Sequence, residues 1–183
     1  MKQESLGISA LEIRAARRDE GGAVRAFYHS LIDRMIDEAG FPGWEKGVHP
    51  SDELLFGSVE RGEMLLGLLG GRIVAGMVLN HEVGQGYDEA RWLVSAPCEQ
   101  VTVLHVLAVD PDLRGRGLAG QMVDYAIEYC QDRDQRSLRL DVMEGNGGAE
   151  RVYERAGFVC AHRRRSVYGW AGEITARLME KVL

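Results

Sequence analysis

The chain has 183 residues, of which 45% are hydrophobic and 27% charged, and its formal net charge is −6. These values predict one globular domain over residues 1–183, and the negative charge argues against a nucleic-acid partner. No apolar run is long enough to cross a bilayer and no basic, apolar leader opens the chain, so we expect no membrane association and a cytoplasmic location. The three cysteines have no paired spacing, so neither a disulfide framework nor a metal site is expected.

The first third of the chain predicts a strand and two helices. Residues 11–15 alternate as in a half-buried strand. Asp19 is placed to cap a helix whose apolar positions recur every three or four residues. Ser51 is placed to cap a second, shorter helix that ends near Gly62.

A hairpin follows directly. Residues 64–69 and 73–79 read as two strands, and the Gly70-Gly71 pair between them supplies the positive φ angles of a two-residue turn. The sequence therefore predicts antiparallel pairing at this point.

The centre of the chain reads as a strand, a glycine- and arginine-rich loop and a helix. Residues 101–109 are dense in β-branched and large apolar side chains, and Asp110-Pro111 ends this strand. The loop over residues 114–120 leads into a helix from Leu118. Glycines allow close approach of the main chain, a helix start presents free N–H groups, and arginines add charge, so the loop suits a pyrophosphate.

This loop also matches a dinucleotide-binding fingerprint, Gly115-x-Gly117-x-x-Gly120, with Asp141 about 20 residues further on. However, residues 110–114 separate the strand from the first glycine, and too few residues follow Asp141 for a doubly wound parallel sheet. A P-loop is excluded because no Gly-Lys-Ser/Thr follows.

The last third predicts three strands and a short helix. Residues 137–143 read as a strand in which Arg139 and Asp141 share one face. This pair is a candidate to bind a zwitterionic or acidic acceptor, but we expect an ordinary ion pair. Asn146 is expected to cap the helix, and residues 158–168 and 173–182 form a final hairpin. The predicted order is β-α-α-β-β-β-α-β-α-β-β.

Arg114-x-x-Gly117-x-Ala119, after Val109-Asp110-Pro111, resembles the acyl-coenzyme A loop of the GNAT family of N-acetyltransferases. A second block of that family is matched by Asn146, Ala149, Tyr153, Gly157 and Phe158. The resemblance implies an α/β (α+β) fold with a central mixed, mostly antiparallel sheet flanked by helices. It also implies transfer of acetyl from acetyl-CoA, as co-substrate, to a primary amine.

The resemblance implies roles for particular residues. Leu107 and Val109 would give main-chain contacts to pantetheine, one of which polarises the thioester carbonyl. Tyr153 would be the general acid for the departing thiolate, and Asn146 a coenzyme contact. The pyrophosphate would be held by Arg114, Gly115, Arg116, Gly117, Leu118, Ala119 and Gly120. The alternatives are a glycine-rich turn with solvated arginines and a tyrosine that only packs.

The general base has two candidates. His105 has the same strand parity as Val103, Leu107 and Val109, which predicts one shared face. Several family members carry a glutamate at the position of Val103, and His105 is placed to substitute for it. Glu82 competes from the end of the preceding strand. The alternative for His105 is a hydrogen-bonded core residue.

Loop residues next to the reaction centre are candidates for the wall of an acceptor pocket, namely Trp44, His49, Tyr87, Trp92 and Trp170. We expect the acceptor to be a small molecule rather than a protein, and the sequence leaves a homodimer open. Two other functions stay open: a non-catalytic acyl-CoA sensor and an NAD-binding oxidoreductase.

Overall fold

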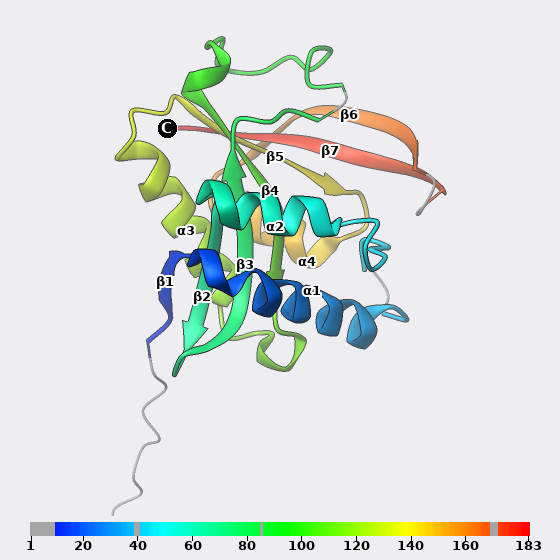
Figure 1. The fold of residues 1–183 in the computed structure, drawn as a ribbon. Helices are drawn as coiled ribbons and strands as arrows, with labels where there is room; N and C mark the ends of the chain where they lie inside the picture. Colours follow the sequence, from blue (N-terminus) through cyan, green and yellow to red (C-terminus); the bar gives the residue numbers. More distant parts are fainter. Residues whose placement is uncertain (1–9, 39–40, 85, 169–171) are drawn as a thin grey trace, which may run out of the picture.

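The computed structural model describes residues 10–38, 41–84, 86–168 and 172–183. The strands and α-helices in this part of the chain follow the predicted order (Figure 1). They are β1 (Glu12–Ala15), α1 (Gly21–Met35), α2 (Asp52–Arg61), β2 (Met64–Leu69), β3 (Arg72–Asn80), β4 (Val101–Val109), α3 (Leu118–Gln131), β5 (Ser137–Met143), α4 (Gly147–Arg155), β6 (Val159–Tyr168) and β7 (Gly172–Val182).

The strands form one seven-stranded sheet in the order β1-β2-β3-β4-β5-β7-β6. Among the described strands, β4 and β5 are the parallel neighbours and every other pair is antiparallel. The mixed, mostly antiparallel sheet is therefore confirmed. A doubly wound parallel sheet is absent from the described residues, so the dinucleotide fingerprint in the loop is a coincidental match.

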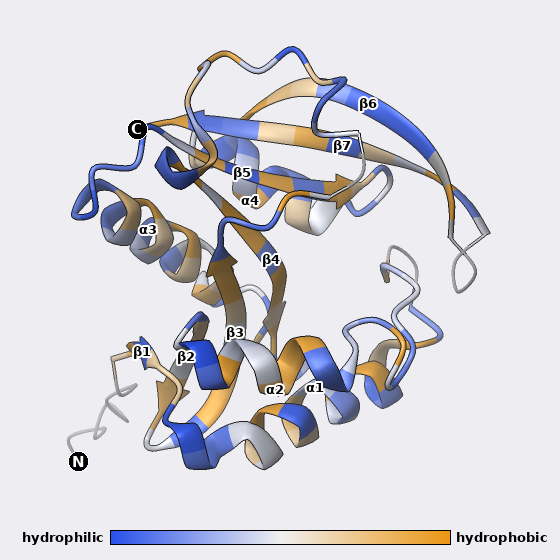
Figure 2. Cartoon of the chain, turned by 45° about the horizontal axis from the view of Figure 1, so that its top comes forward, coloured by the Kyte–Doolittle hydropathy of each residue, from blue (hydrophilic) through white to orange (hydrophobic). Residues whose placement is uncertain are grey.

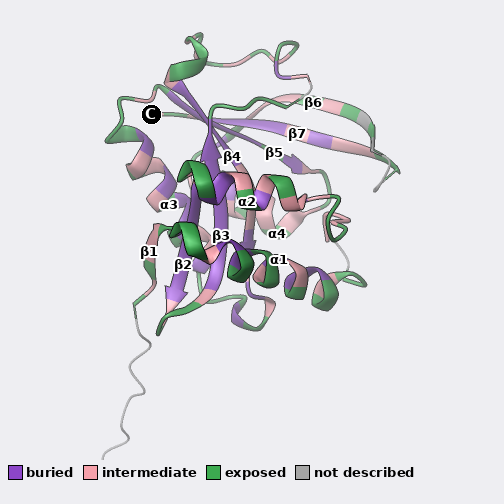
Figure 3. Ribbon diagram, in the orientation of Figure 1, coloured by how far each residue is buried: buried purple, intermediate pink, exposed green. Residues whose placement is uncertain are grey.

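Helices cover both faces of the sheet, α1 and α2 on one side and α3 and α4 on the other (Figure 1). Leu104, Leu138 and Leu140 pack against α3 and α4. Val78 and Ala108 pack against α1 and α2. The central strands are accordingly the most hydrophobic and most buried part of the molecule (Figures 2 and 3).

Strand β4 contains a bulge, which corrects one prediction. His105 pairs with Val78 and Ala108 with Gly76, so three steps along β4 match two along β3. Val106 takes up the extra residue with a φ of 47°. Leu107 therefore packs toward α3 with Leu104, while His105 stays on the opposite face. The predicted shared face of His105, Leu107 and Val109 is wrong, because the bulge reverses the alternation.

A hydrogen bond from α1 supports this bulge. The hydroxyl of Tyr28, which is fully buried, donates to the Val106 carbonyl at 2.9 Å. We expect Tyr28→Phe to lower the free energy of unfolding by about 1–3 kcal/mol, because the carbonyl loses this partner in the interior. Urea denaturation measures the loss, with Tyr125→Phe on α3 as control. An unchanged midpoint would contradict the role of this bond.

Of the two N-caps predicted for α1 and α2, one is confirmed and the other is wrong. Ser51 caps α2 as predicted, accepting the Leu54 N–H at 3.1 Å. Asp19 does not cap α1, because a short 3-10 turn precedes the helix and the Asp19 side chain is 83% exposed. Glu20 acts at this turn instead: its carboxylate accepts the Arg17 N–H at 2.7 Å and two bonds from Arg14 at 2.8 Å.

Candidate active site

Strands β4 and β5 diverge toward one end of the sheet (Figure 1). The site is a cleft that opens where they separate. The two strands pair only from Val101 opposite Ser137 to Val103 opposite Arg139, although both continue beyond this point. The resulting cleft has a volume of about 810 Å³. Its walls are the diverging strands, the loop before α3, the start of α4 and the segment between α1 and α2.

The divergence leaves main-chain groups of β4 without a strand partner on one side. The Asp110 N–H donates to the Val74 carbonyl on β3 at 2.8 Å. Because N–H groups alternate along a strand, the Val109 N–H points to the other side, toward the gap. Leu107 and Val109 both line the cleft. These groups fit an extended amide chain such as pantetheine.

The loop between β4 and α3 presents an unblocked helix start to the cleft. Gly115 and Gly117 both have a φ of 76°, and a Cβ added at either would meet nothing within 4 Å. Gly117 is the N-cap of α3, and no side chain caps the helix. The first N–H groups are therefore free for an anion. The cleft is lined by Arg114, Gly115, Gly117, Leu118, Ala119 and Gly120, whereas Arg116 is not part of the lining.

A buried carboxylate fixes the turn that leads into this loop. Asp110 is 4% exposed and accepts bonds from Arg34 at 2.5 Å, Arg72 at 2.9 Å and the Asp112 N–H at 3.1 Å. Burial opposes ionisation, but these donors outweigh it and the pKa of Asp110 lies below its ordinary value. In the sequence Asp110 is only the end of a strand, because both arginines are distant in the chain.

Tyr153 and Asn146 come to the cleft from α4. Asn146 caps this helix as predicted, accepting the Ala149 N–H at 3.3 Å, and also lines the cleft. Tyr153 is 6% exposed and its ring lies 5.8 Å from that of Phe158. Burial, together with the charge of Asp141, raises the pKa of Tyr153 above its ordinary value. Its phenol is therefore protonated at neutral pH and able to donate.

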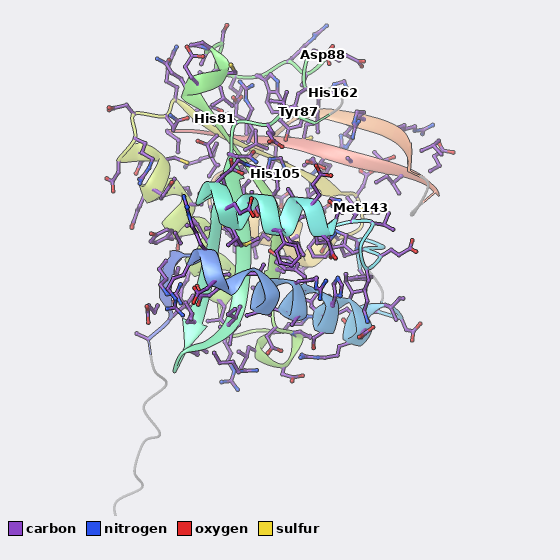
Figure 4. All side chains as sticks on the ribbon, viewed as in Figure 1. His81, Tyr87, Asp88, His105, Met143 and His162 are labelled. Carbon is purple, nitrogen blue, oxygen red and sulfur yellow. The ribbon has the colours of Figure 1, made fainter. Side chains whose placement is uncertain are left out.

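His105 lines the cleft from β4 with a defined tautomer. In Figure 4 it lies where β3 and β4 pass α2. Its Nε2 is 2.9 Å from Oδ1 of Asn80, and the same Oδ1 accepts the Glu82 N–H at 3.0 Å while Nδ2 donates to Glu63 at 3.3 Å. Since Oδ1 can only accept, Nε2 carries the proton and Nδ1 holds the lone pair.

Burial also controls the charge of this ring. It lowers the pKa of His105 below its ordinary value, against smaller raising effects from the carboxylates of Asp141, Glu82 and Glu63. The ring is therefore neutral at pH 7. Glu82, the competing base, lies near this ring but outside the cleft lining: its side chain is 68% exposed and lies 3.9 Å from Arg61.

Asp141 and His49 join His105 in the cleft, a grouping that the sequence did not predict. The pKa of His49 lies below its ordinary value, mainly because the ring is buried. The charge of His105 lowers this pKa further, and the charge of Asp141 opposes the shift. The expected ion pair between Arg139 and Asp141 is wrong: Arg139 pairs with Glu180 on β7 at 3.0 Å. In the described part of the chain, no ion pair or hydrogen bond engages the Asp141 carboxylate. In the sequence, only the alternation of residues along β5 indicated which face of the sheet carries Asp141.

Two of the five aromatic candidates line the cleft. Trp44 and His49 do so, with ring centroids 6.0 Å apart. Tyr87 and Trp92 do not: their rings, 5.0 Å apart, belong to a separate cluster on the sheet. Trp170 lies outside the described residues.

The fold and the cleft define an α/β protein of the acetyltransferase type. The model of the Acetyltransferase (GNAT) family matches residues 24–158. The chain belongs to this family.

Relatives and solved structures agree. An uncharacterized N-acetyltransferase of Methanocaldococcus jannaschii is 35% identical over 82 residues, which cover 45% of this chain and 35% of that protein. The ribosomal protein bS18 alanine N-acetyltransferase of Escherichia coli K12 is 30% identical over 90 residues, 49% of this chain and 61% of that one. The chain thus matches between a third and three fifths of the length of these relatives.

Two solved structures share the whole fold. A GNAT acetyltransferase of Streptococcus agalactiae superimposes with a TM-score of 0.76 at 18% identity, covering 96% of this chain and 97% of that one. A putative acetyltransferase of Salmonella typhimurium, solved with its cofactor acetyl-CoA, gives 0.70 at 15% identity, covering 96% and 95%. In the described residues no helix is long and apolar enough to cross a membrane.

Proposed function

We propose that residues 1–183 form one N-acetyltransferase domain that moves acetyl from acetyl-CoA to the primary amine of a small molecule. The observation that carries this proposal is the divergence of β4 and β5. It leaves the Val109 N–H free between the open start of α3 and the neutral ring of His105. Family membership and the Salmonella structure with acetyl-CoA support it. The Escherichia coli relative is named for a protein acceptor, so acceptor size is part of the proposal.

Bound acetyl-CoA supplies the thioester that the amine attacks. The N–H groups at the start of α3 and Arg114 hold the pyrophosphate, and the Val109 N–H polarises the carbonyl. His105 Nδ1 takes a proton from the amine, and Tyr153 gives one to the leaving sulfur. Attack is direct, in a ternary complex, since none of the three cysteines lines the cleft.

We expect acetyl-CoA, but not NAD, to raise the melting temperature. At 100 times its dissociation constant a ligand adds about 2.7 kcal/mol to the free energy of unfolding. For a domain of this size that corresponds to roughly 5–10 °C. A thermal melt with either ligand measures the shift.

Each outcome of the melt separates the candidate functions. A shift with NAD alone, or with neither ligand, contradicts the proposal. A shift with acetyl-CoA, without thiol release in the presence of any amine, indicates the non-catalytic sensor instead.

A further inference from the structure

The charged residues of the cleft are segregated between its two sides. Arg114 on the loop before α3 and two arginines on α4, Arg151 and Arg155, line the side that carries α3 and α4. Glu38 and Asp141 line the side that carries α1 and α2. Among the described lining residues, this second side has no lysine or arginine.

Asp141 belongs to the second side because of its register on β5. Leu140 and Val142, its neighbours, pack into the core under α3 and α4, so alternation turns Asp141 to the opposite face. Met143, at the end of β5 in Figure 4, also lines the cleft. Glu38 is already paired with Arg114. Asp141 is therefore the cleft carboxylate without a counter-ion among the described residues.

Aromatic rings wall the same side. The Phe41 and Trp44 centroids are 6.3 Å apart at 67°, and those of Trp44 and His49 are 6.0 Å apart at 77°. Burial lowers the pKa of both His49 and His105, so neither ring adds positive charge at neutral pH. A lone carboxylate beside neutral and aromatic rings attracts a cation with an apolar body, and it repels a second anion.

Building on the proposed function, we infer that the acceptor is a small arylalkylamine-like cation without a carboxylate group, held by its ammonium at Asp141 and by its ring against Trp44. The reaction forms a bond between the amine nitrogen and the acetyl carbon and breaks the bond from that carbon to sulfur. The bound ammonium first loses one proton through His105 to solvent, which leaves the neutral amine that attacks. The second nitrogen proton then goes to His105, and the sulfur receives a proton from Tyr153. Transfer of the His105 proton through solvent restores the Tyr153 phenol, so one proton is released per turnover. Asp141 is a specificity-determining residue: it binds the acceptor and takes no proton in the reaction.

A matched acceptor set tests the inference. We expect 2-phenylethylamine to give a kcat/KM about 10-fold or more above phenylalanine, which adds a carboxylate to the same body, because repulsion by Asp141 opposes that group. Thiol release from acetyl-CoA is measured for both, and for an alanine-initiated peptide. Equal or faster turnover of phenylalanine or of the peptide overturns the inference.

Replacing Asp141 tests the residue itself. Asp141→Asn should raise KM for 2-phenylethylamine by about 10- to 100-fold, the effect of one hydrogen bond to a charged group, with an unchanged melting shift on acetyl-CoA. Calorimetry of the amine binding to the CoA-saturated protein gives a second readout. Glu144→Gln, just past β5 and outside the cleft lining, is the control. An unchanged KM and affinity overturn the inference.

These results separate the inference from the proposed function. If acetyl-CoA gives no melting shift, the proposed function fails. If the shift is present and only phenylalanine is acetylated, the proposed function stands and this inference fails. If only the peptide is acetylated, the inference fails together with the small-molecule part of the proposed function.

Discussion

Replacing His105 by alanine is expected to lower kcat/KM for an alkylamine acceptor by about 10²- to 10⁴-fold, the usual contribution of a positioned general base. An alkylamine is protonated at neutral pH and must lose a proton before it can attack. His105 is neutral and lines the cleft, and its Nδ1 holds the lone pair because the Nε2–H group donates a hydrogen bond to Oδ1 of Asn80. Thiol release at saturating acetyl-CoA measures the change.

Two controls distinguish a lost base from a disturbed fold. The variant should keep the melting shift on acetyl-CoA, because His105 lies on the face away from the α3 loop. Added imidazole should restore part of the rate. Full kcat in the variant, or failure of imidazole to restore any activity, would contradict the role of His105.

The pH profile supplies a further readout of the same variant. The groups that face the ring are Asn80, Glu82 and Glu63 from the β3 side, and Asp141 and His49 across the cleft. Burial outweighs the carboxylates, so the acid limb of kcat/KM in the native protein has its midpoint below about 6.5. Activity falls as the pH drops through this midpoint, because the ring takes up a proton. His105→Ala should lack this limb.

Local features of the fold were predictable from the sequence. The central strand, the start of α3 at Leu118 and the Asn146 cap match the predictions because each depends on spacing within a few residues. The glycine-rich loop was visible for the same reason. The two blocks that resemble the GNAT family lie within one continuous stretch, so the fold could be predicted from them without any knowledge of distant contacts.

Contacts between residues that are distant in the sequence were not predictable. The bulge at Val106 reverses the alternation of β4, and a valine at positive φ leaves no signal in the sequence. Arg139 pairs with Glu180 rather than with Asp141, its neighbour on the same face, because β7 lies next to β5. His49 reaches the cleft only through the packing of the segment between α1 and α2. The residues of the proposed acceptor pocket could not be predicted, because their positions depend on such contacts.

Tyr153→Phe is expected to lower kcat by about 10²- to 10³-fold, within the range of a lost general acid. The departing thiolate needs a proton, and the buried phenol of Tyr153 lines the cleft with a pKa above its ordinary value. Phenylalanine keeps the ring and its contact with Phe158. The loss therefore reports the hydroxyl alone, and thiol release measures it.

The matched control is Tyr129→Phe, which removes a hydroxyl from α3 outside the cleft lining and should leave kcat unchanged. The alkaline side of the profile tests the assignment further. Burial and Asp141 hold the pKa of Tyr153 above about 10, so the acid stays protonated while a rising pH frees more of the amine. The native rate should then rise toward pH 9 without an alkaline loss. An unchanged kcat in Tyr153→Phe would mean that this tyrosine only packs, and that water protonates the thiolate.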